Sequence, residues 1–596
     1  MPKIKPSINY TNRDFESIRT DLESYVKRYY PDNLKDFTQA SFGALMLDTV
    51  SYVGDMLSFY IDYQANESFL ETAMEFDNVL KLSNELGYKY KPYPSSFGVC
   101  NFYITVPSET LYQGPDNDYN PVLKKGSTFI STSNTIFTLL EDVDFSLSEN
   151  TILVAEQDSD SGAPTSYAVQ SAGQIVSGEL AIQEVLVEEF EKFLRIPIDG
   201  ENISEIVSVF DSNGNQYFEV DYLTQNVLYV PVLNRGSDSS TVPYILKPVS
   251  VARRFVVDYT LDGIFLQFGY GSDEIPVSLK DPSEVVLQLH GKDFVSDTAF
   301  DPSVLNETDK LGVVPSNTIL TIIYRINTNS NVNSAANSVT GIGTVDFQFT
   351  SPENLDNAKM DSVRNSLAAS NEDPIVGDVT VVSSDEIKLR ARGHFATQYR
   401  AVTKQDYISI VYNMPSKYGK IKRCIVELDS DSYNQRNLNM YVISEDTNDL
   451  LTTTNDTIKS NLKTWVNQYK MINDTVDILD AKIANIGIEF RVLAFPGTNK
   501  YDLLNECTTT LQTVFDKTFY IGEPLMITDV YQTLKSVPNL MDVISVKIVV
   551  KNGGSYADSP IKIEDVISAD GRYVVPPSDT IFEIKFPNAD ITGTIE

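Results

Sequence analysis

The hydrophobic and polar positions between residues 36 and 93 follow the period of a helix. From Phe42 to Tyr63, apolar side chains recur three and four residues apart and fill two adjacent rows. The only polar stripe left between them is narrow and contains Asp48, Asp55 and Asp62 at seven-residue intervals. A helix that is apolar most of the way round must be buried, so we expect other chains or other domains to cover it. A core helix of one large domain is the alternative that this pattern leaves open. The residues expected to bind partner helices in a bundle are Phe42, Leu45, Met46, Val50, Tyr52, Val53, Met56, Leu57, Phe59, Tyr60 and Tyr63.

Two shorter helices are predicted on either side of this long one. Apolar residues have helical spacing between residues 11 and 30, and again between residues 76 and 86. Gly87 stands where a helix commonly ends, and Pro92 and Pro94 prevent the helix from continuing. Residues 1–95 are therefore expected to form a helical segment. We expect no membrane span, because the three aspartates would lie in the hydrocarbon and no stretch of 18 apolar residues occurs elsewhere.

The pattern changes to period two at about residue 96, which is typical of half-buried strands. Clusters of glycine, asparagine, aspartate and proline separate these strands up to about residue 374, which predicts a β-rich middle region of mostly antiparallel sheets. The strands are expected at 97–106, 127–131, 135–140, 151–157, 189–198, 204–211, 225–233 and 318–326.

Helices and strands alternate from about residue 375 to the end. This order favours an α+β region, with helices on one face of antiparallel sheets, over residues 375–596. It can be divided into subdomains at 375–481 and 482–596. The fold class expected for the whole chain is therefore α+β multidomain, with a helical bundle segment, a β-rich middle and an α+β C-terminal region. Helices are expected at 403–414, 457–469, 501–519 and 528–535, strands at 420–428, 437–444, 476–481, 485–495 and 542–550, and a last strand pair around Pro576 and Pro577.

The charge and the cysteine content exclude several classes of protein. The 596 residues have a formal net charge of −35, whereas binding to nucleic acid requires an excess of lysine and arginine. Three distant cysteines give neither a disulfide framework nor a zinc site, which suits a reducing cytoplasm. The first 15 residues contain no apolar stretch, so no secretory signal is expected.

The sequence shows no catalytic motif. Only two histidines are present, His290 and His394, and neither has a nucleophile motif beside it. No cofactor, metal site or catalytic residue is expected. A glycosidase-type pair of carboxylates is left open, because the 82 acidic residues provide many pairs and a sequence does not give their separation.

A local excess of positive charge stands out in the acidic chain. Nine basic residues and a single acid, Asp406, lie between residues 388 and 423. If residues 386–393 form a strand, alternate basic residues share one face of it. We hypothesise that this basic edge binds an acidic surface of another copy or another chain. A solvated face is the alternative. The edge comprises Lys388, Arg390, Arg392, Arg400, Lys420, Lys422 and Arg423.

Several short motifs occur in the order found in one family. Residues 400–407 read R-A-V-T-x-x-D-Y, residues 125–129 read K-G-S-T-F, and residues 321–325 end in Y-R. Residues 268–271 look like an F-G-D-G turn with Tyr270 in place of the acid, and residues 520–525 like an I-G-x-P turn. From about Asn9 to Phe586 the chain resembles the J-like baseplate wedge proteins of contractile-tailed phages, of the T4 type. The N-terminal residues that carry the resemblance are Phe42, Gly43, Leu47, Asp55, Asn66, Glu67, Phe69, Leu70, Ala73, Leu86, Gly87, Tyr88 and Pro92.

The resemblance implies a structural subunit of the tail baseplate rather than an enzyme. It implies two copies of the chain per wedge, joined to a third, different wedge chain through an N-terminal helical bundle. It also implies C-terminal domains that pair around a ring, which widens when the sheath contracts before the genome is ejected into the host. The location would be the virion tail baseplate, assembled in the host cytoplasm. Two other functions are kept: a tail-associated cell-wall hydrolase and a tail protein that binds the host surface.

Overall fold

The computed structural model describes residues 14–30, 41–90, 93–109, 114–159, 163–233, 244–260, 263–272, 311–327, 331–377, 382–429, 437–515, 518–558 and 561–596. The chain divides into two compact units. The first unit comprises Met1–Tyr90 with Val381–Gln398, and the second comprises Lys91–Thr380 with Tyr399–Glu596. The division of the chain at residues 95, 374 and 481 stays a prediction.

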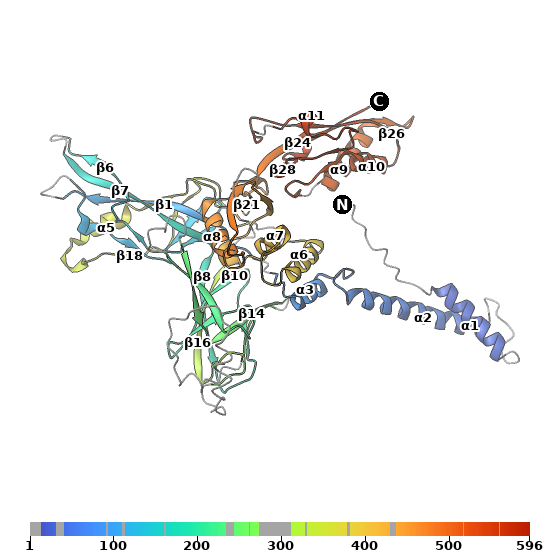
Figure 1. Ribbon diagram of the computed structural model, residues 1–596, viewed down its shortest axis with the longest axis horizontal. Coiled ribbons are helices and arrows are strands. Elements are labelled where there is room, and N and C mark those ends of the chain that lie inside the picture. Colours follow the sequence, from blue (N-terminus) through green and yellow to red (C-terminus); the bar gives the residue numbers. More distant parts are fainter. Residues whose placement is uncertain are drawn as a thin grey trace. The chain divides into compact units, whose positions relative to one another are not determined.

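The N-terminal unit is helical, as the pattern of apolar residues predicts. The side chains of Asp14 and Ser41 accept hydrogen bonds from backbone N–H groups in the first turns of α1 and α2, and Gly87 has a positive φ of 88° just after α3. Figure 1 shows α1 lying along α2, and α3 beside α6. The helices are α1 (Phe15–Tyr29), α2 (Phe42–Glu67), α3 (Phe76–Glu85) and α6 (Ser384–Thr397).

The strand expected at residues 386–393 is wrong, because these residues belong to helix α6. Ser383 caps this helix by accepting a hydrogen bond from the N–H of Glu386. Ile387, Ala391 and His394 are buried, at the i, i+4 and i+7 positions of one helix face. The segment therefore satisfies both periods over a short length, and packing against α3 decides between them.

A seven-stranded antiparallel sheet begins the second unit. Its strands follow the order β17-β3-β4-β7-β1-β19, and β6 pairs with β7 beside this path. Its core contains Phe102, Phe129 and Phe137, and α5 (Asn357–Asn365) packs on β1. The strands are β1 (Phe97–Pro107), β3 (Thr128–Ser131), β4 (Ile136–Leu139), β6 (Thr151–Gln157), β7 (Pro164–Ser177), β17 (Val339–Ile342) and β19 (Ala368–Ser370), with a small sheet of β2 (Val122–Leu123), β5 (Val143–Asp144) and β18 (Phe347–Gln348).

A second seven-stranded, barrel-like sheet has the order β8-β16-β10-β11-β14-β15-β9. The side-chain amide of Gln183 on β8 connects the two outer strands, because it donates to the carbonyl of Pro197 and accepts from the N–H of Asp199. The strands are β8 (Glu179–Val187), β9 (Arg195–Ile198), β10 (Ile203–Asp211), β11 (Gln216–Glu219), β14 (Arg254–Thr260), β15 (Gly263–Phe268) and β16 (Thr318–Ile326), and a hairpin consists of β12 (Val227–Leu233) and β13 (Tyr244–Ser250).

Two sequence expectations in this sheet need correction. The strand expected at 189–198 is confined to β9, because Phe193 has a positive φ of 57° and ends regular pairing. Two glycines in a turn such as that at residues 268–271 commonly provide positive φ, but neither glycine has a positive φ here. A Cβ at Gly269 would lie 2.0 Å from the carbonyl oxygen of Leu311. This glycine is therefore required for close approach of two backbones.

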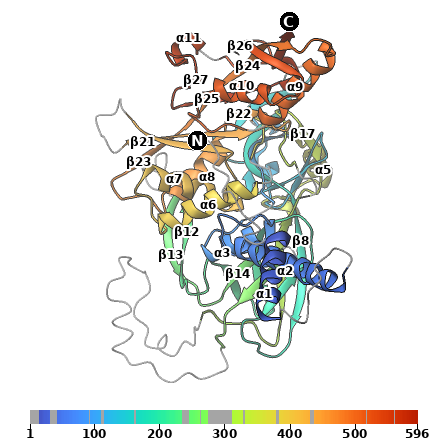
Figure 2. The same ribbon diagram turned by 90° about the vertical axis from the view of Figure 1, so that its right-hand side faces the viewer.

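The C-terminal part of the second unit contains two α+β layers, which confirms the expected fold class. Thr403 and Asp406 form a capping box at the start of α7. The first layer consists of α7 (Lys404–Tyr412), α8 (Asp456–Val466), β20 (Arg423–Leu428), β21 (Asn437–Glu445), β22 (Leu451–Thr452) and β23 (Thr475–Asp480). The second consists of α9 (Lys500–Phe515), α10 (Ile527–Lys535), β24 (Lys482–Ala494), β26 (Leu540–Val550), β28 (Thr580–Glu583) and β29 (Ile591–Ile595), with the short β25 (Leu525–Met526), β27 (Tyr573–Val574), α11 (Ile563–Val566) and α12 (Pro587–Asp590). Figure 2 shows α9 and α10 beside β24 and β26.

The C-terminal sheets are mixed rather than purely antiparallel. β23 pairs parallel with β21, and β28 and β29 both pair parallel with β24. The strands around Pro576 and Pro577 do not form a pair with each other, since β27 pairs with β25 and β28 with β24. Parallel partners come from distant parts of the chain, which local alternation in a sequence does not indicate.

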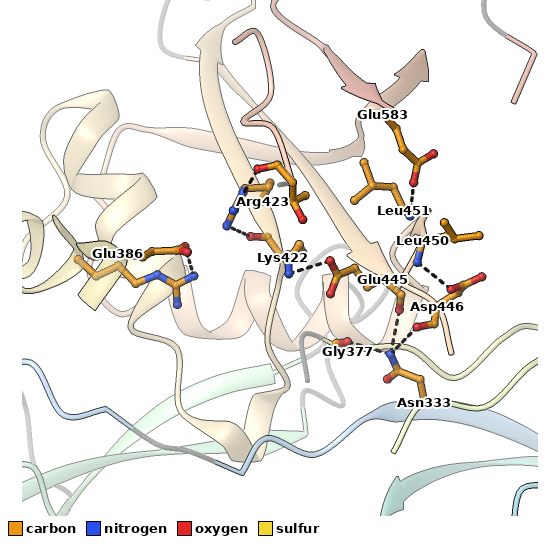
Figure 3. A network of polar contacts seen from close by, with 12 residues as sticks. Asn333, Gly377, Glu386, Lys422, Arg423, Glu445, Asp446, Leu450, Leu451 and Glu583 are labelled. Carbon is orange, nitrogen blue, oxygen red and sulfur yellow. Dashed lines mark hydrogen bonds and ion pairs between the residues drawn. The ribbon is translucent and has the colours of Figure 1, made fainter. Parts of the chain in front are cut away.

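Buried polar contacts join the layers of the second unit (Figure 3). The amide of Asn333 donates to the carbonyls of Gly377 and Glu445, and the Nζ of Lys422 lies 2.7 Å from the carboxylate of Glu445. Glu583 accepts a hydrogen bond from the N–H of Leu451. Polar contacts therefore join the segments around Asn333 and Gly377 to the first C-terminal layer, and the first C-terminal layer to the second.

Candidate assembly surface

Helix α2 exposes nearly all of its apolar side chains. Ten of the eleven residues expected to bind partner helices are exposed, from 40% for Met56 to 75% for Phe42, and Tyr63 is half-buried. Ile61, which lies on the same side, is 67% exposed. The buried residues of α2 are instead Gly43, Ala44, Ser51 and Glu67. A surface helix normally buries its apolar face and exposes its polar face, and α2 does the reverse.

Helix α1 covers the small and polar side of α2. Ala44 and Ser51, which are seven residues apart, are fully buried there. A Cβ added at Gly54 would lie 3.3 Å from the side chain of Ile18. Arg19 forms an ion pair with Asp48, with 2.7 Å between Nε and Oδ1. The contact with α1 therefore leaves the apolar rows of α2 uncovered.

The uncovered apolar surface extends roughly 200° around α2, because successive residues lie about 100° apart around a helix. Around the helix circumference, Phe59 lies at one edge of this surface and Ile61 at the other. Asp48, Asp55 and Asp62 lie outside it, and Glu67 is buried. One packed helix covers a stripe on the order of 100° wide. Burial of this surface therefore requires at least two more helices in addition to α1.

A buried carboxylate fixes the turn that follows α2. Glu67 accepts hydrogen bonds from the N–H groups of Met74 and Glu75, at 2.8 and 3.3 Å, and from the side-chain amide of Asn78 at 2.9 Å. Burial opposes ionisation, but these hydrogen bonds outweigh it and lower the pKa of Glu67. The carboxylate thus caps the start of α3, where no residue of the usual N-cap position does so. Glu67, one of the residues that carry the family resemblance, therefore has a structural role.

The predicted basic residues of α6 make contacts within the N-terminal unit. Arg392 forms an ion pair with Glu71, and Lys388 donates a hydrogen bond to the carbonyl of Glu71. Arg390 is buried and lies 2.7 Å from Glu386, one helical turn before it. On a helix these three side chains do not form the row that a strand would give them.

The other predicted basic residues lie in the second unit. Lys422 is buried against Glu445, and buried Arg423 donates to the carbonyls of Lys422 and Thr518 and lies over the ring of Tyr520. Arg400 is exposed and Lys420 is half-buried. Because the side chains of Lys422 and Arg423 are buried, they do not present charge to a partner. The structure thus brings Lys422 and Arg423 together but does not unite the seven residues in one edge; docking through those that are exposed stays a prediction.

The described residues contain few groups that suit catalysis. Burial raises the pKa of the Cys100 thiol to about 12 and that of the Cys507 thiol to about 11, which keeps both protonated. His394 is buried in α6 with its ring near Tyr88, whereas His290 lies outside the described residues. Within the ranges given above, no group of three or more potential metal-ligating side chains is found. No helix of the described residues is long and apolar enough to span a membrane.

Sequence reasoning missed some exposed apolar residues of the N-terminal unit. Tyr25, Tyr29 and Tyr30 at the end of α1 are more than half exposed, as are Phe69 and Met74 in the turn before α3. Helical spacing predicts that apolar residues share a helix face, but it does not tell whether that face is covered. These exposed residues add to the apolar surface of this unit.

Residues 14–85, which contain α1, α2 and α3, match the family model described as bacteriophage baseplate protein, N-terminal domain. No curated protein matches the chain. Among solved structures, the chain is similar to one from the cryo-EM structure of the anti-feeding prophage baseplate, with 9% identity and a TM-score of 0.26, over 96% of this chain and 98% of that chain. It is also similar to a chain of the type VI secretion system TssK-TssF-TssG baseplate subcomplex, with 8% identity and a TM-score of 0.22, over 74% of this chain and 96% of that chain. TM-scores this low do not establish a common fold.

Proposed function

We propose that this protein is a non-enzymatic structural subunit of a phage-type tail baseplate, located in the virion tail. The observation that carries the proposal is the exposed apolar surface of α2, within the segment that matches a baseplate N-terminal domain. An exposed apolar surface this extensive marks a site of protein–protein interaction. The baseplate match gives the kind of assembly in which such partners would be found.

In this proposal, α2 packs in a bundle with helices from a second copy of the chain and from another baseplate chain. The angular width of the apolar surface supports this arrangement, since it needs at least two further helices. The finer role is that of a wedge subunit, joining neighbouring wedges into a ring. When the sheath contracts, the domains would rotate as rigid bodies about loops such as 370–376.

Sedimentation velocity over a concentration series tests the proposal on the full-length chain. Deletion of residues 1–95 would be a poor comparison, because it would expose Ile387 and Ala391 on α6. The better variant carries four substitutions on the exposed side of α2, each at a residue that is close to half exposed or more: Val53→Gln, Leu57→Gln, Tyr60→Gln and Ile61→Gln. Its matched control replaces four exposed apolar residues of the second unit: Leu428→Gln, Ile472→Gln, Met541→Gln and Tyr501→Gln.

We expect the wild-type chain and the control variant to associate as the concentration rises, and the α2 variant to remain monomeric. Loss of four apolar contacts of about 1 kcal/mol or more each would lower the association constant by at least a hundredfold. A wild-type chain that stays monomeric, or an α2 variant that associates as well as the control, would contradict self-association through α2.

A further inference from the structure

Strand β8 carries apolar residues on both of its faces. Ala181, Val185 and Val187 point toward the core of the barrel-like sheet. On the opposite face, Ile182 is 66% and Leu186 is 69% exposed. A strand with one face in water normally alternates apolar and polar residues, and a strand with two apolar faces is normally covered on both. The outer face of β8 therefore has the composition of a covered surface.

The register of the sheet extends this apolar surface onto neighbouring strands. Leu186 lies opposite Ile319 of β16, and Ile182 lies opposite Ile323. Directly opposite residues project from the same face of a sheet and lie side by side. Ile323 in turn lies opposite Ser208 of β10. We call the group of outward residues on β8, β16 and β10 the outer β8 face; it comprises Leu180, Ile182, Glu184, Leu186, Glu188, Ile319, Thr321, Ile323, Ser208 and Phe210.

The charge on the outer β8 face has one sign. Glu184 is exposed within the apolar row of β8, and exposed Glu188 directly follows the strand, where its carbonyl still accepts a hydrogen bond from the N–H of Asn317. Among the paired positions of β8, β16 and β10, the basic residue on this side is Arg325, which is buried and forms an ion pair with Glu205 at 2.8 Å. Two carboxylates thus lie within an apolar surface, and their Cα atoms are about 13 Å apart, four residues along a strand.

We propose that the outer β8 face binds a different protein chain, through an apolar surface that carries two lysine or arginine residues about 13 Å apart. Charge complementarity decides between this partner and a second copy. Two outer β8 faces in contact would bring four carboxylates together, in a chain whose net charge is already −35. Like charges brought together in this way are unfavourable, whereas lysine or arginine side chains pair with them. This surface lies in the second unit, so the proposal stands or falls separately from the proposed role of α2.

The probe for the test is a labelled β-hairpin peptide with isoleucines and two lysines, four residues apart, on one face and threonines on the other. A second hairpin has glutamates in place of the lysines. Binding to the full-length chain is measured by fluorescence anisotropy at about 50 mM and about 500 mM salt, since screening weakens exposed ion pairs. The apolar variant is Ile182→Thr with Leu186→Thr, and the charge variant is Glu184→Gln with Glu188→Gln. The control variant, Leu153→Thr with Ile544→Thr, changes exposed apolar residues on other strands.

We expect the lysine hairpin to bind the wild-type chain about tenfold or more tightly than the glutamate hairpin at low salt. The apolar variant should bind the lysine hairpin about tenfold more weakly. The charge variant should bind both hairpins equally, with no dependence on salt. The control variant should bind as the wild type does. The substituted side chains are exposed, so thermal unfolding should be unchanged. If the threonines of the apolar variant alter folding, the charge variant still tests the proposal. Equal binding of both hairpins, or apolar and charge variants that bind as the wild type does, would overturn the proposal. Self-association of the chain alone that the apolar variant abolishes would overturn it too, by making a second copy the partner.

Discussion

Glu583 is a buried carboxylate that connects three segments of the C-terminal layers. Its two oxygens accept hydrogen bonds from the N–H of Leu451 at 2.7 Å and from the side-chain amide of Asn485 at 2.6 Å. Asn485 in turn accepts a hydrogen bond from the N–H of Ala557. Burial raises the pKa of Glu583 above its ordinary value, despite these donors. The folded state therefore binds a proton at this carboxyl more tightly than the unfolded state does.

A raised pKa in the folded state fixes the sign of a pH effect. The stabilising contribution of Glu583 is complete below the unfolded pKa of about 4.3 and is lost as the pH rises through the folded pKa. We expect Glu583→Gln, which cannot ionise, to remove this part of the pH dependence. The difference in free energy of unfolding between wild type and variant should shift in favour of the variant as the pH rises from about 4 to about 7. Urea unfolding at several pH values measures it, with exposed Glu564→Gln as the control. A difference that does not change with pH would refute the prediction.

At the scale of elements, the contact of α1 with α2 depends on small side chains. Ser51 is fully buried beneath α1, while no residue of α1 is itself buried. An isolated helix of 15 residues is marginal in water, so α1 depends on this contact.

We expect Ser51→Leu to displace α1 without unfolding α3. Overpacking of this kind destabilises a contact by about 1–3 kcal/mol, and the contact between α1 and α2 buries no residue of α1. Hydrogen exchange should show faster exchange of the amides of residues 15–29, with unchanged exchange in α3. Val50→Leu is the matched control, because Val50 is the preceding residue and is 50% exposed. If the amides of α1 exchange equally fast in both variants, the small side chain of Ser51 is not what holds α1 on α2.

Elements with local signals were predicted well from the sequence. The helices α1, α2 and α3 follow from periodicity. Gly87 and the Thr403–Asp406 capping box mark helix ends through backbone chemistry that neighbouring residues supply. The two apolar rows of α2 were predicted from the same periodicity, and their binding to partner helices stays a prediction. The wrong predictions concern elements that depend on distant contacts. Residues 384–397 form helix α6 because they pack against α3, and β28 and β29 pair parallel with β24. Lys388, Arg390 and Arg392 do not form the expected row of basic side chains, because they lie on helix α6 and not on a strand.

At the scale of the whole molecule, the N-terminal unit is not continuous in sequence. Ile387 and Ala391 of α6 are fully buried in one core with Ala73, Val79 and Tyr88. The matched baseplate domain ends at residue 85 and does not include this helix. The unit therefore obtains part of its core from a segment beyond most of the middle region.

We expect Ile387→Ala to destabilise the N-terminal unit by about 2 kcal/mol or more, as large-to-small substitutions in a core do. The effect should appear at a distance in sequence, as faster hydrogen exchange of the α3 amides at residues 76–85. Leu389→Ala on the same helix is the control, because Leu389 is 59% exposed. If hydrogen exchange in α3 is unchanged and the Ile387→Ala variant unfolds no faster than the wild-type chain, α6 is dispensable for this unit.

The place of α6 in the N-terminal unit also sets an order of events on the ribosome. The residues of α3 leave the exit tunnel roughly 300 residues before those of α6, which at about 5–20 residues per second is a delay of about 15–60 s. During this interval α3 lacks the part of its core that Ile387 and Ala391 supply, while α2 already displays its apolar side chains. The nascent chain is therefore most exposed to premature association or to chaperone binding before residue 397 has emerged, and partner helices that arrive early would meet an unfinished unit.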